Sequence, residues 1–143
     1  MSALTLSQAQ TIVTTALAHA RGAKFQPLAV LVLDARGVPK AFAAEDGTSL
    51  RRYEIAHGKA HGALSMGIGS RTLGKRAEER PHFIAAVTHV VGGALIPVPG
   101  GVLIRAADRA IVGAVGVSGD TSDNDEAAAL AGIAAAGLTA DPG

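Results

Sequence analysis

The spacing of apolar residues along the chain predicts a series of helices. In three segments, apolar side chains recur every three or four positions and form one stripe, as in an amphipathic helix. A fourth segment opens with Pro81, which suits the first turn of a helix. A fifth is short and rich in charge, as an exposed helix is. We expect these helices at residues 5–21, 50–66, 71–79, 81–91 and 122–136.

Polar residues near the predicted helix starts offer several ways to cap them. A Ser or Thr followed three residues later by Gln can form a capping box, in which each side chain accepts a hydrogen bond from the backbone N–H of the other residue. The candidates are Ser7 with Gln10 or Thr5 with Gln8 for the first helix, and Thr48 or Ser49 for the second.

Continuous apolar and β-branched runs between the helices predict strands. The turn at residues 34–37 is too short for a crossover, so the strands on either side of it form an antiparallel hairpin. The later connections are equally short. The chain therefore predicts an α/β fold in one domain spanning residues 1–143, with an antiparallel sheet of about five strands packed with helices. We expect strands at residues 28–33, 38–45, 94–98, 102–105 and 109–117, and a frayed tail at 139–143.

Charge and residue usage narrow the function classes. The formal net charge of +1 gives no electrostatic case for binding nucleic acid or a membrane surface. The chain has no cysteine, which excludes thiolate chemistry and disulfides. No apolar run approaches the ~20 residues of a membrane-spanning helix, and we see no secretory signal. These features predict a cytoplasmic protein.

The composition also favours self-association. Hydrophobic residues make up 48% of the chain, whereas charged residues make up only 17%, against about 25% in typical domains. A small domain with so little charge is expected to bury part of its surface against copies of itself. The alternative is that alanine, which surfaces tolerate, inflates the apolar fraction.

The glycine-rich segment 111–126 looks at first like a phosphate-binding loop, because it runs from a strand through glycines into a helix. No Gly-Lys-Ser/Thr follows the glycines, so it is not a P-loop. Four acids crowd the predicted helix start and would repel a phosphate, while they suit the positive end of the helix dipole. We interpret this segment as the turn that seats the last helix against the sheet.

Two histidines, His57 and His61, lie four residues apart on the second predicted helix. Side chains at this spacing share one helix face, within reach of a single divalent metal ion. Glu54 lies one turn earlier and is a candidate third ligand. The alternative is an ordinary solvated polar face.

A second candidate site is the turn at Gly100 and Gly101, whose successive backbone amides can hold an anion. Lys59 or Arg71 would supply the positive charge beside it. Glu45, at a strand end, is a candidate acid or base. The alternatives are a plain hairpin turn and a carboxylate that only caps.

These motifs, in this order and spacing, resemble the GlcG/HbpS-like family, which includes the C-terminal domain of PduO-type proteins. The resemblance covers nearly the whole chain, from Leu6 to Gly137. It is carried by Val32–Asp34 with Gly37, Asp46–Gly47, Ile55–Ala56 with Lys59–Ala60, Arg71–Thr72, Gly92–Gly93, Pro99–Val102, and Gly113–Gly119 with Asp125–Ala127.

The resemblance implies a profilin-like fold and assembly into homo-oligomers, from dimer to octamer. It also implies binding of a small-molecule ligand, which is haem in some members, and an operon for glycolate or diol catabolism. The chain departs from the family pattern at Ala44–Glu45, where Arg-Met is usual, and at Leu103, where Pro is usual. The pair His57 and His61 has no obvious counterpart in the family.

Three functions follow as hypotheses. The first is a haem- or small-ligand-binding protein, in which Arg71 or Lys59 pairs with propionates. The second is an enzyme on a small carboxylate metabolite, with or without a metal at His57 and His61: Lys59, Gly100 and Gly101 hold the anion, and Glu45 or His57 moves a proton. The third is a purely structural subunit. Candidate axial ligands for haem are His57, His61, His19 and His82, and candidate stacking rings are Phe25, Phe42, Tyr53 and Phe83.

Overall fold

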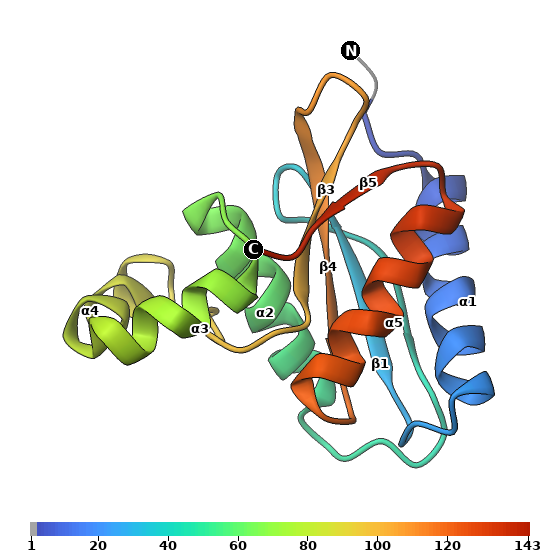
Figure 1. Cartoon of the computed structure of the whole chain (residues 1–143), viewed down its shortest axis with the longest axis horizontal. Coiled ribbons are helices and arrows are strands. Elements are labelled where there is room, and N and C mark those ends of the chain that lie inside the picture. Colours follow the sequence, from blue (N-terminus) through green and yellow to red (C-terminus); the bar gives the residue numbers. More distant parts are fainter. Residues whose placement is uncertain (1–2) are drawn as a thin grey trace.

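The computed structural model describes residues 3–143 as an antiparallel five-stranded sheet with helices on both faces (Figure 1). The strand order is β2-β1-β4-β3-β5, and every neighbouring pair is antiparallel. This confirms the α/β fold expected from the sequence. In chain order the elements are α1 (Leu6–Gly22), β1 (Ala29–Asp34), β2 (Pro39–Ala44), α2 (Arg52–Met66), α3 (Ser70–Glu79), α4 (Pro81–Val90), β3 (Gly101–Arg105), β4 (Ile111–Ser118), α5 (Ser122–Ala135) and β5 (Thr139–Asp141).

The interior strand β1 is apolar on both sides because helices cover both faces of the sheet. Val30 and Val32 point into the core formed with α1 and α5. Leu31 and Leu33 alternate with them and pack beneath α2 on the other face. A run of consecutive apolar residues is therefore the expected pattern for this strand.

Two glycines let α2 lie unusually close to the sheet. A Cβ atom on Gly116 of β4 would stand 1.9 Å from the carbonyl oxygen of Ala56. A Cβ atom on Gly101 of β3 would stand 2.2 Å from the carbonyl oxygen of Lys59. Both obstructing atoms are helix backbone, which cannot swing aside as a side chain can. The position of α2, and of every side chain on it, is set by this contact.

The helix starts agree with the sequence in part. The capping box of Thr5 with Gln8 is present at α1. The expected cap of α2 by Thr48 or Ser49 is wrong. Arg51 occupies the cap position without a side-chain bond, and the Ser49 hydroxyl instead accepts a hydrogen bond from the Arg52 side chain.

Two predictions about strands were wrong, one before β3 and one at the C-terminal tail. Residues 94–98 form no strand: Pro97 has no backbone N–H to donate, and the segment packs on α2, where Ile96 lies against Gly58. The tail expected to fray supplies the fifth strand instead, because β5 pairs with the free edge of β3. An ion pair of 2.9 Å between Arg105 and Asp141 holds it there.

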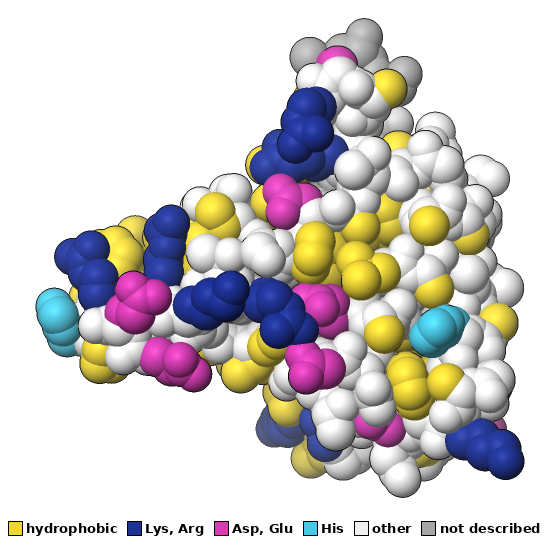
Figure 2. All heavy atoms as spheres, viewed as in Figure 1, with side chains coloured by type: hydrophobic (Ala, Val, Ile, Leu, Met, Phe, Trp, Pro, Cys, Tyr) yellow, Lys and Arg dark blue, Asp and Glu magenta, His cyan; other side chains and the backbone are white. Residues whose placement is uncertain are grey.

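Helices α3 and α4 project from the side of the sheet as an arm (Figure 1). A small cluster of Leu73, Ile84 and Leu95 holds the arm together. Basic and acidic side chains are interspersed over its visible surface (Figure 2), as on an ordinary solvated surface. Within residues 3–143, no helix is long and apolar enough to cross a membrane.

The close approach of α2 to the sheet predicts a large cost for a methyl group at Gly116. The free energy of unfolding of the Gly116→Ala variant is expected to be lower than that of the wild type by at least about 3 kcal/mol. This is the upper end of the usual cost of overpacking a core. Urea unfolding measures this. Gly22→Ala is the matched control, because no atom lies within 4 Å of its added Cβ. A Gly116→Ala protein as stable as the parent would contradict the packing described.

Candidate functional site

Four flat side chains from β2 and α2 form a continuous row, here called the aromatic–imidazole row: Phe42, Tyr53, His57 and His61. Phe42 meets Tyr53 edge-on, with ring centroids 4.9 Å apart. The Tyr53 and His57 rings are nearly parallel at 6.0 Å, and the His57 and His61 rings at 5.2 Å. The sequence named all four residues, but only the fold brings Phe42 to the other three.

Helix periodicity and strand register account for the row. Tyr53, His57 and His61 are each four residues apart, so they lie one above the other on α2. Phe42 pairs with Leu31 across the hairpin and therefore points to the α2 side of the sheet. Because β2 is an edge strand, this end of the row stays open: Phe42 is 41% exposed.

His61 has a fixed protonation pattern. Its Nδ1 atom lies 2.9 Å from the carbonyl oxygen of Ala94, which can only accept a hydrogen bond, so Nδ1 carries the proton. The Ser65 hydroxyl is farther away, at 3.5 Å. In the neutral ring this tautomer leaves Nε2 of His61 with a free lone pair. A backbone carbonyl that orients an imidazole in this way is typical of histidines that bind metals.

His57 is held in its neutral form. Partial burial of its ring lowers the pKa of His57 below the ordinary value of 6.5, and the neighbouring His61 lowers it further. Neutral imidazole is the form that ligates a metal. The row thus presents two imidazoles, one of them held by a backbone carbonyl, beside two exposed aromatic rings.

A shallow hollow adjoins His61. Its volume is about 190 Å³, and it lies between α2 and the turn that joins β1 to β2. Arg36 lines it, with a largely exposed guanidinium that makes two hydrogen bonds to Asp34, at 3.0 and 3.3 Å. Gly37 lies against the ring edge of His61, since its added Cβ would be 3.7 Å from the histidine Cδ2.

Lys59 does not face any open site. Its side chain is 3% exposed. The ammonium group donates a hydrogen bond of 2.8 Å to the Val117 carbonyl and forms an ion pair of 3.0 Å with Asp125. Burial lowers the pKa of Lys59 and raises the pKa of Asp125, while their mutual attraction opposes both shifts. Asp125 also accepts a hydrogen bond from the backbone of Asp120. The pair fastens α2 to β4 and α5.

The Gly100–Gly101 turn does lie beside Lys59, as expected, but the backbone N–H of Gly101 is already hydrogen-bonded within the protein. The N–H of Gly101 donates to the Ser70 hydroxyl at 2.7 Å, and that hydroxyl donates to the Gly101 carbonyl at 3.1 Å. A Cβ on Gly100 would come within 2.9 Å of the Lys59 nitrogen. The turn thus fits around the buried ammonium and connects β3 to α3.

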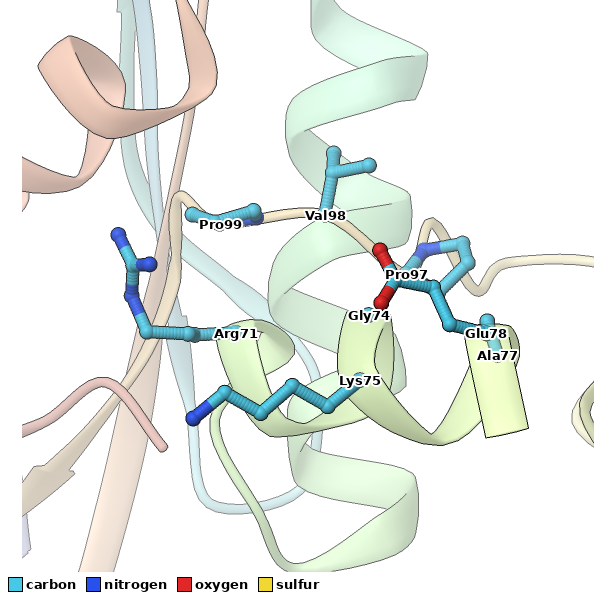
Figure 3. Close-up of a pocket in the computed structure, with 8 residues that line it drawn as sticks. All are labelled: Arg71, Gly74, Lys75, Ala77, Glu78, Pro97, Val98 and Pro99. Carbon is cyan, nitrogen blue, oxygen red and sulfur yellow. The ribbon is translucent and has the colours of Figure 1, made fainter. Parts of the chain in front are cut away.

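Arg71 borders a cleft of about 380 Å³ between α3 and the loop before β3. Figure 3 shows Arg71 and Lys75 extending in the same direction from α3, with Pro97 and Pro99 across the cleft. Arg71 makes paired hydrogen bonds to Glu126, at 2.9 and 3.0 Å. Asp123 accepts another of its hydrogen bonds. These bonds raise the pKa of Arg71 and offset much of its charge.

Glu45 also has a structural role. Its carboxylate accepts a hydrogen bond of 2.8 Å from the Leu28 backbone and forms an ion pair of 2.8 Å with Arg21. Through these two interactions, Glu45 links the end of α1 to the start of β1. A role in proton transfer would compete with these two interactions.

The structure therefore brings together some of the predicted site residues and leaves others apart. His57 and His61 meet, but Glu54 is paired with Arg51 instead of joining them. No group of three His, Asp or Glu side chains suited to a metal occurs within residues 3–143. The Ala94 carbonyl and Arg36 were missed. No local signal marks either one, because a carbonyl is present at every residue and arginine is common in exposed turns.

Comparison with known proteins gives consistent results. A family model described as haem-degrading protein HbpS-like matches residues 4–134. A double mutant of HbpS from Streptomyces reticuli is 28% identical, with a TM-score of 0.79 over 94% of this chain and 87% of that one. The PduOC–haem complex, 22% identical, has the same fold, with a TM-score of 0.85 over 96% and 98% of the two chains. No curated protein matches the sequence.

The buried ion pair predicts a strong effect of removing one partner. Lys59→Met is expected to lower the free energy of unfolding by about 3–5 kcal/mol, because it leaves the Asp125 carboxylate buried without a counter-charge. The control is Lys75→Met, on an exposed lysine, which should change it by at most about 0.5 kcal/mol. Equal stability of the two variants in urea would show that the pair does not fasten α2.

The lowered pKa of His57 predicts a pH effect on stability. The His57 ring is harder to protonate in the folded state than in the unfolded state. Its contribution to the free energy of unfolding is therefore fully present above pH 6.5, and it is lost as the pH falls through the lowered pKa of the folded protein. Above pH 5, Asp34 and Asp120 remain ionised, since their pKa values are lowered from 3.8. The wild-type protein should therefore lose stability relative to His57→Phe between pH 7.5 and about 5. Parallel stability curves for the two proteins would disprove this.

Proposed function

The chain belongs to the HbpS-like family of haem-degrading proteins, and from this premise we propose that it binds haem on the aromatic–imidazole row. One observation carries the proposal. His61 has its Nδ1 proton committed to the Ala94 carbonyl, so its Nε2 is free and oriented to serve as an axial ligand to iron. HbpS and the PduOC–haem complex share the fold, which supports the class of ligand.

The surroundings of His61 fit a porphyrin. Haem is flat and largely apolar, and the row offers the exposed faces and edges of Phe42 and Tyr53 on the same side of α2. His57 lies between Tyr53 and His61 in the row, stacked against both rings. When bound, the haem iron would supply the redox and ligand chemistry, and these side chains would hold and orient the ring.

The charged partner of the haem propionates is assigned to Arg36. The Arg36 side chain lines the hollow next to His61 and is 78% exposed, so it can turn to a carboxylate. Asp34, its present partner, would keep the hydrogen bonds that it accepts from the backbone N–H groups of Arg36 and Val38. Lys59 and Arg71, the partners expected from the sequence, are less suitable. Lys59 is buried in its pair with Asp125, and Arg71 is held by Glu126 and Asp123.

The other expectations from the sequence have weaker support. An enzyme acting on a small carboxylate would use Glu45 and Lys59, and both are engaged in the scaffold. That hypothesis stays a prediction, as does the cytoplasmic location. Assembly into homo-oligomers is part of our proposal, because Leu50 and Val90 leave 86% and 84% of their apolar surfaces exposed.

A haemin titration followed at the Soret band tests the proposal. The wild-type protein should show a saturable shift at micromolar haemin. His61→Ala should weaken binding by at least about tenfold, since the axial nitrogen is lost, and should change the position of the band. Arg36→Ala should cause a smaller loss, because a single exposed ion pair contributes about 1 kcal/mol or less.

The controls are His19→Ala and His82→Ala, which remove exposed histidines outside the row. Both should bind haemin as the wild-type protein does. The proposal fails if the wild-type protein shows no saturable shift. It also fails if His61→Ala binds as tightly as the controls with an unchanged spectrum, because another group would then hold the iron.

A further inference from the structure

We infer that His57 and His61 together form a second kind of site, which binds a bare divalent ion of the late transition metals in the absence of haem. The inference shares His61 with the proposed haem site but does not depend on haem. It rests on the separation of the two rings, the hydrogen bond that orients His61 and the lack of a hydrogen-bond partner for His57 within residues 3–143.

The separation of the rings suits one metal ion. A tetrahedral ion about 2.0–2.1 Å from one nitrogen of each ring places the two ring centroids roughly 5 Å apart. The centroids of His57 and His61 are 5.2 Å apart before any metal is present. The distance between the two rings therefore matches that of two imidazoles on one ion.

Each ring has a nitrogen without a hydrogen-bond partner in residues 3–143. The Ala94 carbonyl engages Nδ1 of His61, which leaves its Nε2 without one. The ring of His57 makes no hydrogen bond to a protein group in this part of the chain. The carbonyl behind His61 supplies the outer support that orients a ligating imidazole.

The chemistry of the donors selects the metal. Two imidazoles favour Cu²⁺, Ni²⁺ and Zn²⁺ over Mg²⁺ and Ca²⁺, which prefer oxygen ligands. Glu54, the nearest carboxylate along α2, is engaged by Arg51 at 2.6 Å, so water would fill the remaining positions. The site is thus open to solvent, and the general order of stability places Cu²⁺ first.

Calorimetric titration of haem-free protein with Cu²⁺ tests the inference, with Mg²⁺ as the ion that should not bind. The wild-type protein should bind one Cu²⁺ per chain, with an electron paramagnetic resonance spectrum showing two nitrogen ligands. His57→Phe and His61→Ala should each weaken binding by at least about tenfold, the lower end of what loss of even an outer-shell partner costs. His19→Ala and His82→Ala should bind as the wild type does.

The readout also separates this inference from the haem proposal, because no haem is present in the titration. A protein that binds Cu²⁺ through both histidines but shows no Soret shift supports the metal site and refutes the haem site. Cu²⁺ binding that is unchanged in both His57→Phe and His61→Ala overturns the metal site. A wild-type spectrum with a single nitrogen ligand overturns it as well, whatever the haemin titration shows.

Discussion

The buried ammonium of Lys59 sets the orientation of α2, and the rest of the molecule depends on that orientation. Its bonds to Val117 and Asp125 join the helix to β4 and α5, in an interior where an unpaired charge would be very costly. Gly101 and Gly116 also help to position α2, because they let the backbone of the helix approach the sheet closely. Together the ion pair and the close contact define which face of the helix reaches solvent.

The candidate site lies on the opposite face as a direct consequence. His57 and His61 each stand two residues from Lys59, and two residues turn an α-helix by about 200°. With Lys59 held in the interior, both imidazoles are directed outward, between the hairpin turn and the segment before β3. One interaction in the core therefore determines where the chemistry of the surface is presented. This explains why a lysine that looks like a ligand residue has a structural role.

Much of the fold follows from sequence, because helices and buried strands carry strong periodic patterns. The errors came where tertiary context decides. Residues 94–98 look like a strand but pack on α2, and β5 looks like a loose tail but finds the open edge of β3. For the site, the pair His57 and His61 was predictable from spacing alone. From the sequence, Glu45 could not be distinguished from a catalytic carboxylate, because its partner Arg21 is distant in the sequence.

The sequence by itself determined the helix faces, the hairpin, the glycine turns and the presence of two imidazoles one turn apart, because these depend on residues close together in the chain. Only the tertiary structure decided what each charged group does. It placed Phe42 beside Tyr53, supplied the Ala94 carbonyl that fixes the His61 proton, and brought Arg36 to the same hollow. The physical reason is that the protonation and availability of a group depend on neighbours that are remote in sequence.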